Sequence, residues 1–382
     1  MQKHISRYLK PQILEVLHQG KVIVLYGARR TGKTTLVKDI LVDYAETGRY
    51  LNCDLLSDRN MLQTTDHREL FSYLGGYKLV VIDEAQSIPN IGLVLKILVD
   101  TFPEIQVIAT GSSSFDLANK IGEPLTGRSR QFMMFPLSLG EISESGYDRL
   151  SIESGIGNLL RFGSMPSVFD RPESQAIPEI QEIATNYLYR DVLMHEKLKK
   201  SELLDNLLEA LALQLGSEVS YNELAQTLNT SPQTVQKYIE LLEKSFVVFR
   251  IKSLCRNPRK ELEIKNSRKV YFYDLGVRNS IVRNFNPINL RTDIGALWEN
   301  FCILELMKKL NRDQIFYNQY FWRTKVAMKE IDLVIDYGGQ LKAYEFKWSQ
   351  KKIPKFPTQF QSFYTGATFT VVNSQNFWNE LV

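Results

Sequence analysis

Residues 27–34 carry a pattern that can bind phosphate groups. They read Gly-Ala-Arg-Arg-Thr-Gly-Lys-Thr and fit G-x-x-x-x-G-K-[ST] without a mismatch. The glycines let several backbone N–H groups point inward, and we expect Lys33 to reach the β- and γ-phosphates of ATP. The Thr34 hydroxyl is expected to hold Mg²⁺. The candidate nucleotide-binding residues are Gly27, Ala28, Arg29, Arg30, Thr31, Gly32, Lys33, Thr34 and Thr35.

Two adjacent carboxylates form the second candidate site. Asp83 and Glu84 directly follow the apolar residues 79–82. They are expected at the carboxyl end of a buried strand, which is where ligands bind in open α/β sheets. We expect Asp83 to orient the shell of the Mg²⁺ ion and Glu84 to act as a catalytic residue that polarises the attacking water.

Polar residues at the end of a further predicted strand, 105–110, and just after it are candidates for sensing the nucleotide. Either Ser112 or Thr110 is expected to contact the γ-phosphate or the attacking water. Arg128 follows this strand and could stabilise charge on the phosphoryl group in the ATP site of a neighbouring subunit. The alternatives are that Arg130 has this role, or that Arg128 is an ordinary surface residue.

The elements that must position these residues follow from the spacing of apolar side chains. Residues 22–26 form the β-branched and aliphatic run of a buried parallel strand. Apolar residues at 36, 37, 40 and 41 have the spacing of one helical face. A strand, a glycine-containing loop and a helix in this order predict a phosphate-binding loop on a parallel α/β sheet.

The order of these motifs resembles that of the AAA+ ATPases. Residues 161–168, 187–192 and 271–276 are also similar to segments of one prokaryotic family within the AAA+ superfamily. This resemblance covers essentially the whole chain. It implies an ATPase domain in residues 1–137 and a helical lid in residues 138–198. It also implies assembly into an oligomer, with a hexameric ring as the expected form.

Arg190 lies in the segment that resembles the lid-helix motif of this family. The resemblance implies that Arg190 contacts the nucleotide as a second sensor, and the alternative is an ion pair with an acidic side chain. The family's usual P-loop has Gln-Val where this chain has Arg30 and Thr31. Both are variable positions of the pattern, so the departure changes little.

Residues 199–252 are predicted to form a winged helix-turn-helix. Ser220 and Ser231 each have the position of a helix cap, and Pro232 opens the second helix. Residues 246–251 supply a strand. The second helix exposes glutamine and lysine side chains that could enter the major groove of DNA. The alternative is a spacer within an oligomeric interface.

Residues 253–382 contain acidic residues and a lysine that resemble the core of the PD-(D/E)XK nucleases. Glu345 and Lys347 alternate on one predicted strand and so share a face, and Asp332 lies on the preceding strand. Glu299 would supply the helical carboxylate. In that core the carboxylates hold Mg²⁺, and the lysine steadies the attacking water or the phosphate. Three roles stay open: DNA cleavage, DNA binding without cleavage, and oligomer assembly or protein contact.

The composition is that of a folded protein, with 44% hydrophobic and 24% charged residues among 382. No apolar run approaches the roughly 18 residues that span a bilayer, and the first residues lack the apolar core of a signal peptide. The three cysteines are scattered and have no zinc-site spacing. We therefore expect a cytoplasmic protein with no membrane partner.

Positive charge is concentrated toward the end of the sequence. Residues 250–382 carry 22 Lys and Arg against 12 Asp and Glu, whereas residues 1–249 carry 25 against 31. Such a basic segment indicates a polyanionic partner, and DNA is the one we expect. A well-solvated surface is the alternative reading of the charge.

Together these patterns predict an α/β protein with an AAA+ P-loop parallel sheet and helical lid, then a winged helix-turn-helix, then a mixed α/β restriction-endonuclease-like domain. The expected activity is Mg²⁺-dependent ATP hydrolysis by an oligomer that acts on DNA, either duplex or branched. The alternatives are an ATP-gated switch that binds a protein partner and an ATP-licensed, metal-dependent nuclease.

Overall fold

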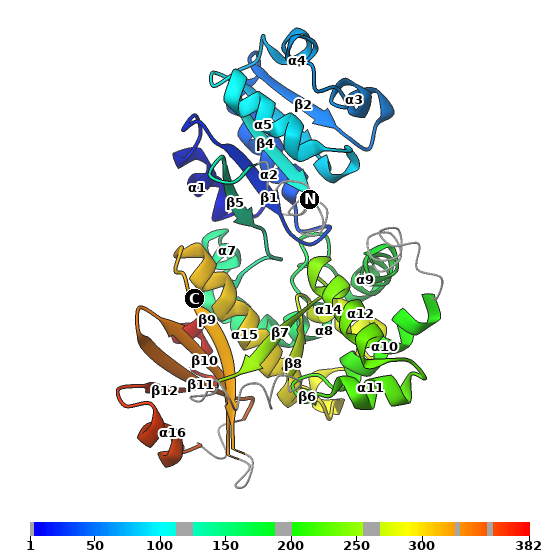
Figure 1. Cartoon of the computed structure of the whole chain (residues 1–382). Helices are drawn as coiled ribbons and strands as arrows, with labels where there is room; N and C mark the ends of the chain where they lie inside the picture. Colours follow the sequence, from blue (N-terminus) through cyan, green and yellow to red (C-terminus); the bar gives the residue numbers. More distant parts are fainter. Residues whose placement is uncertain (1–3, 112–124, 188–200, 255–267, 325–328, 350–353) are drawn as a thin grey trace. The chain divides into compact units, whose positions relative to one another are not determined.

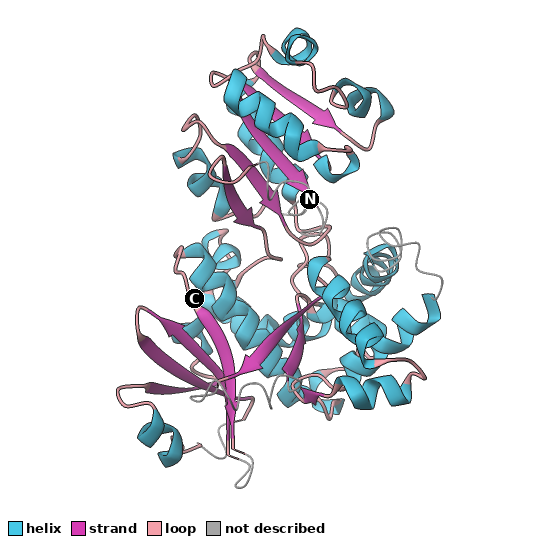
Figure 2. Cartoon of the chain, viewed as in Figure 1, coloured by secondary structure: helices cyan, strands magenta, loops and turns pink. Residues whose placement is uncertain are grey.

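The computed structural model describes residues 4–111, 125–187, 201–254, 268–324, 329–349 and 354–382 (Figures 1 and 2). The chain divides into two compact units. The N-terminal unit consists of His4–Leu137 with Lys244–Phe246, and the C-terminal unit consists of Ser138–Glu243 and Val247–Val382. Within the described ranges, no helix is both long enough and apolar enough to cross a bilayer.

A five-stranded sheet forms the centre of the N-terminal unit. All of its strand pairs are parallel, in the order β2-β3-β4-β1-β5, which confirms the predicted parallel sheet. The strands are β1 (Val22–Tyr26), β2 (Gly48–Asn52), β3 (Leu79–Asp83), β4 (Gln106–Gly111) and β5 (Ser129–Met133). The loop after β1 and the ends of β4 and β3 therefore lie along one edge of the sheet.

Helices cover both faces of this sheet, as Figure 2 shows. Val22 and Val24 pack on one face with residues of α4 and α5, whereas Ile23 and Leu25 pack on the other face with residues of α1 and α2. Burial on both faces explains why the central strands are almost continuously apolar. The helices are α1 (Leu9–Glu15), α2 (Lys33–Leu41), α3 (Leu56–Met61), α4 (His67–Leu74) and α5 (Ile91–Thr101).

The first half of the C-terminal unit is mostly helical. The predicted lid region contains α7 (Leu139–Glu144), α8 (Arg149–Phe162) and α9 (Glu173–Tyr187). The predicted helix-turn-helix region contains α10 (Ser201–Leu213), α11 (Tyr221–Thr227) and α12 (Pro232–Lys244). Ser231 caps α12 by accepting a hydrogen bond from the Thr234 N–H at 3.1 Å. Val235, Ile239 and Leu242 are buried, as the helical spacing predicts.

A seven-stranded mixed sheet runs through the C-terminal unit in the order β12-β11-β10-β9-β7-β8-β6. Strand β7 pairs antiparallel with β8 and parallel with β9, so this sheet is continuous across the predicted boundary at residue 252. Its strands are β6 (Glu218–Val219), β7 (Val248–Ser253), β8 (Arg268–Phe272), β9 (Asn318–Arg323), β10 (Glu330–Tyr337), β11 (Gln340–Lys347) and β12 (Thr368–Asn373).

The helix α15 (Ile294–Arg312) packs against this mixed sheet. Its buried Asn300 side chain accepts a hydrogen bond from the Phe272 N–H of β8 at 2.8 Å and donates one to the Phe272 carbonyl at 2.9 Å. The Trp298 indole donates to the Val372 carbonyl of β12 at 3.3 Å. Because β8 and β12 both contact one turn of α15, the sheet must curl around this helix.

Two of the segments that carry the family resemblance meet in the C-terminal unit. The buried Asp274 carboxylate caps α14 (Leu275–Ile281) by accepting the Val277 N–H at 3.1 Å, and it also accepts the Ser164 N–H at 2.9 Å. A Cβ atom on Gly163 would lie 2.2 Å from Asp274 Oδ1. The glycine in residues 161–168 is therefore explained by close packing against residues 271–276.

Candidate functional site

The backbone of residues 27–32 requires glycine at both ends of the loop. Gly27 has a φ of +149°, and a Cβ atom there would lie 2.2 Å from the Met134 carbonyl oxygen. Gly32 has a φ of +96° and occupies the cap position of α2. Any other residue would be strained at these φ values, so the two glycines fix the path of the loop from β1 into α2.

Lys33 holds the loop from within. Its side chain is buried, and its Nζ atom donates hydrogen bonds to the carbonyl oxygens of Gly27 and Ala28, each at 2.8 Å. The Thr31 hydroxyl also donates to the Ala28 carbonyl at 2.8 Å. The ammonium group therefore already lies inside the loop, at the place where the sequence pattern predicts phosphate groups to bind.

Arg7 braces the loop from outside, and sequence reasoning missed it. Its guanidinium donates to the Thr31 carbonyl at 2.5 Å and to the Phe135 carbonyl at 2.6 Å. It thereby ties the loop to the segment that follows β5. No pattern in the sequence around Arg7 signals this contact, because the partners are main-chain atoms distant along the chain.

The Asp83 carboxylate is the centre of the hydrogen-bond network at this edge of the sheet. Asp83 ends β3 and is 3% exposed. Its Oδ2 atom accepts hydrogen bonds from the Thr34 hydroxyl at 2.8 Å and from the Tyr50 hydroxyl, and its Oδ1 atom accepts one from the Thr110 hydroxyl. The structure thus brings together the predicted P-loop threonine, the strand-end aspartate and one of the two sensor candidates.

Tyr50 is a member of this network that sequence reasoning missed. It lies on β2, next to β3 in the sheet, and burial together with its hydrogen bond to Asp83 raises the pKa of the phenol. The Lys38 ammonium also lies 4.8 Å from the centre of the Tyr50 ring. The contact of Tyr50 with Asp83 follows from the position of β2 beside β3, and this strand order is known only from the structure.

Glu84 follows Asp83 in a left-handed backbone conformation, with a φ of 54°. Its N–H donates to the Thr110 hydroxyl at 3.3 Å, and its carboxylate accepts a hydrogen bond from the Gln86 side chain. Thr110 therefore contacts both candidate acidic residues. The other sensor candidate, Ser112, lies outside the described residues, and so does Arg190.

Arg128 is far from the P-loop of its own chain. Ser129 pairs with Val22 at the start of β1, whereas Gly27 follows the end of that strand, so the two sites are about 17 Å apart along the strand direction. The Arg128 side chain is 41% exposed and forms an ion pair with Asp100 at 2.6 Å. Arg130 is exposed on β5.

The predicted nuclease-like residues meet in the C-terminal unit. Lys347 Nζ on β11 lies 2.7 Å from Glu345 Oε1 and 3.8 Å from Asp332 Oδ2 of β10. The Phe346 N–H donates to Asp332 Oδ2 at 2.8 Å. Glu299 on α15 belongs to the same cluster, because it shares a lysine partner with Asp332.

That lysine is Lys269 on β8, which sequence reasoning missed. Its Nζ atom lies 3.0 Å from Glu299 Oε1, 2.5 Å from Glu330 Oε1 and 4.0 Å from Asp332 Oδ1, and its side chain is 2% exposed. The Tyr271 hydroxyl on the same strand donates to Glu299 Oε1 at 2.5 Å. Within the described residues, no group of three or more His, Cys, Asp or Glu side chains is arranged to hold a metal ion.

Burial changes the pKa values of this cluster. Burial, followed by the charge of Asp332, raises the pKa of Glu299 and of Glu345 to about 7. Burial also raises the pKa of Asp332. Although burial alone would lower the pKa of Lys269, the carboxylates around it raise that pKa above its ordinary value. The cluster therefore favours a charged Lys269.

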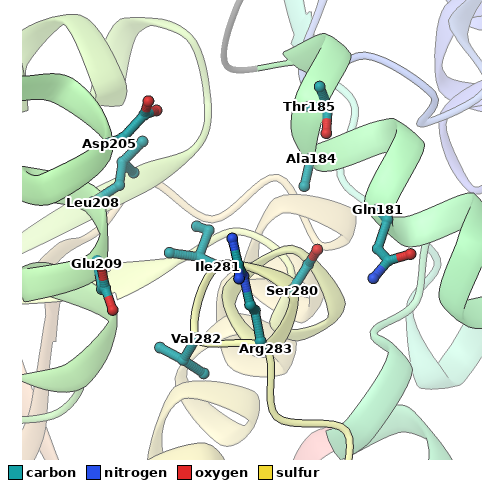
Figure 3. A pocket seen from close by; sticks show the side chains of 10 residues that line it. All are labelled: Gln181, Ala184, Thr185, Asp205, Leu208, Glu209, Ser280, Ile281, Val282 and Arg283. Atoms are coloured by element: carbon teal, nitrogen blue, oxygen red, sulfur yellow. The ribbon is translucent and has the colours of Figure 1, made fainter. Parts of the chain in front are cut away.

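A pocket of about 800 Å³ opens between α9, α10 and the end of α14 (Figure 3). Its lining residues are Gln181, Ala184, Thr185, Asp205, Leu208, Glu209, Ser280, Ile281, Val282 and Arg283. Figure 3 shows acidic side chains of α10 on one side and the Arg283 side chain at the middle. None of the residues that the sequence motifs singled out lines this pocket.

Three family descriptions match successive parts of the chain. The AAA domain matches residues 19–143. Two domains of unknown function follow, DUF8612 over residues 155–288 and DUF4143 over residues 294–377. The N-terminal unit therefore carries an AAA-type P-loop domain, as the sequence predicts.

Relatives occur in bacteria and archaea, and they are described as uncharacterized proteins. One from Mycobacterium tuberculosis is 27% identical over 339 residues, which is 88% of this chain and 72% of the relative. One from Methanocaldococcus jannaschii is 27% identical over 336 residues, covering 76% of this chain and 69% of the relative. One from Haemophilus influenzae is 24% identical over 327 residues, covering 80% of this chain and 79% of the relative.

Solved structures give weaker likenesses. The Thermotoga maritima RuvB Holliday junction branch migration motor has a TM-score of 0.32 and 17% identity, covering 68% of this chain and 95% of that chain. A structure of Drosophila ORC bound to AT-rich DNA and Cdc6 has a TM-score of 0.28 and 11% identity, covering 72% of this chain and 91% of that chain. Because both TM-scores are low, we draw nothing from either likeness.

Proposed function

We propose that the N-terminal unit binds ATP with Mg²⁺ and hydrolyses it. The contact between the Thr34 hydroxyl and Asp83 Oδ2 at 2.8 Å carries this proposal. It joins the phosphate-binding loop to the strand-end carboxylate, which are the two parts that P-loop NTPases use to hold a nucleotide and its metal ion. If residues 27–34 were only a glycine-containing turn before a surface helix, a contact between Thr34 and the buried Asp83 would not be expected.

Different residues of this site would bind the phosphates and activate the water. The loop N–H groups and the Lys33 ammonium would bind the phosphates, and Lys33 would exchange its two carbonyl partners for phosphate oxygens. Glu84 would orient the attacking water and accept its proton, and Thr110 would hold the backbone at Glu84 by accepting its N–H.

The oxygen atoms present suit Mg²⁺, which prefers carboxylate, hydroxyl and phosphate oxygens. Thr34 and Asp83 would hold the ion, which would neutralise charge on the phosphates as the transition state forms. Tyr50 and Thr110 would keep the Asp83 carboxylate oriented, because each donates a hydrogen bond to it.

A matched pair of variants at Thr34 tests this proposal. Thr34→Val removes the hydroxyl and keeps the shape, whereas Thr34→Ser keeps the hydroxyl. Binding of a fluorescent ATP analogue should be tightened by Mg²⁺ in the wild type and in Thr34→Ser, but not in Thr34→Val. Equal Mg²⁺ dependence in all three proteins would contradict the role proposed for Thr34.

Arg128 is proposed to act on the nucleotide of a second copy of the chain. Arg128 lies about 17 Å from its own P-loop along the strand direction. An arginine side chain is too short to span this distance, which supports action on another copy. The proposal requires an oligomer, and a hexameric ring is the form that the family resemblance implies.

We further propose that the oligomer acts on DNA. Residues 250–382 carry 22 basic against 12 acidic residues, which supports a polyanionic partner. The exposed polar residues of α12, Gln233, Gln236 and Lys237, support the same partner. A switch that binds a protein partner is the alternative, and it predicts ATP turnover that DNA leaves unchanged.

A further inference from the structure

We propose that Lys269 takes the place of the metal ion in the nuclease-like core, so that this core holds its carboxylates together with a resident ammonium group and does not cleave DNA. The inference is independent of ATP hydrolysis, because the residues that carry it all lie in the C-terminal unit.

The position of Lys269 carries the proposal. Its Nζ atom contacts carboxylates from two elements, Glu299 of α15 and Glu330 of β10, at 3.0 and 2.5 Å. Asp332, another of the carboxylates expected to hold the metal, lies 4.0 Å from the same atom. This cation is 2% exposed and surrounded by acidic groups, so it occupies the position that a divalent ion would need.

Strand alternation explains how the lysine reaches this place. Lys269 and Tyr271 are two residues apart on β8 and share one face, and both contact Glu299. Glu330 and Asp332 share one face of β10 in the same way. The curl of the sheet around α15 brings these two faces together at Glu299.

The second lysine neutralises the remaining carboxylates. Lys347 contacts Glu345 at 2.7 Å and Asp332 at 3.8 Å, so each of the three carboxylates predicted to bind a metal has an ammonium group within 4.0 Å. One oxygen, Glu345 Oε2, is buried without a hydrogen-bond partner among the described residues.

Counting bound Mn²⁺ by electron paramagnetic resonance tests the proposal on the full chain without nucleotide. The wild type and Asp332→Asn should bind the same amount of Mn²⁺, since the core holds none. Lys269→Met should gain about one Mn²⁺ per chain, and adding Asp332→Asn to it should remove that gain. Lys269→Arg is the matched control, because it keeps the charge and should gain nothing.

Two results would overturn the proposal. One is wild-type Mn²⁺ binding that Asp332→Asn removes, and this comparison holds even if Lys269→Met does not fold. The other is a folded Lys269→Met protein that gains no Mn²⁺. Nicking of supercoiled plasmid by the wild type in Mn²⁺, abolished in Asp332→Asn, would contradict the inferred lack of cleavage.

Discussion

Replacing Thr110 by valine removes one hydroxyl from the centre of the proposed ATP site and keeps the side-chain shape. Thr110 is fully buried on β4, where it donates to the Asp83 carboxylate and accepts the Glu84 N–H at 3.3 Å. We expect Thr110→Val to slow ATP hydrolysis while nucleotide affinity changes little, because neither contact of Thr110 belongs to the phosphate-binding loop.

The size of the effect follows from the hydrogen bond to a charged group. Such bonds contribute about 1.5–3 kcal/mol. If this energy is lost only in the transition state, the turnover number falls by about 10- to 150-fold, since each tenfold change corresponds to about 1.4 kcal/mol. The weaker contact with the Glu84 N–H, at 3.3 Å, adds little to this range.

A phosphate-release assay at saturating ATP measures the effect, and analogue binding measures the affinity. Thr110→Ser is the control, because it keeps the hydroxyl and should retain most of the activity. Unchanged turnover in Thr110→Val would refute the role of Thr110. A parallel loss of affinity and turnover would show that the residue supports the fold of the site instead.

Three further predictions concern other parts of the chain. Arg128→Ala should lower turnover by about 10³-fold or more while nucleotide binding persists, and Asp100→Ala should not. Gly163→Ala should reduce the free energy of unfolding in urea by about 2–4 kcal/mol, because its Cβ would lie 2.2 Å from Asp274. Gly155→Ala, inside α8 and with nothing within 4 Å, should be neutral or slightly stabilising, because alanine favours a helix interior more than glycine does. DNA affinity measured by fluorescence anisotropy should fall steeply between about 50 and 200 mM salt, and flat affinity would exclude phosphate contacts.

The P-loop and the Asp83 strand could be predicted because local sequence determines them. A buried strand, glycines at Gly27 and Gly32 and a following helix leave few alternative conformations. The carboxyl ends of parallel strands meet at one edge, so Asp83 and the P-loop are expected at the same edge, and the structure places Asp83 beside Thr34 there.

Lys269 and Tyr50 could not be predicted, because their contacts depend on strand order. Lys269 lies in the sequence Arg-Lys-Val-Tyr-Phe, which has no feature that separates an inward lysine from a solvated one. Only the curl of the mixed sheet brings it to Glu299 and Glu330. Similarly, β7 was predicted as the strand of a winged helix, and its parallel pairing with β9 has no local signal.

ATP turnover with Mg²⁺ is the measurement that tests the central claim most directly. The wild type should release phosphate, and Glu84→Gln should bind the ATP analogue but release almost none. Turnover should rise with at least one of single-stranded DNA, linear duplex or a four-way junction. Equal phosphate release by the wild type and Glu84→Gln would contradict hydrolysis at this site, and turnover indifferent to every DNA would contradict the action on DNA.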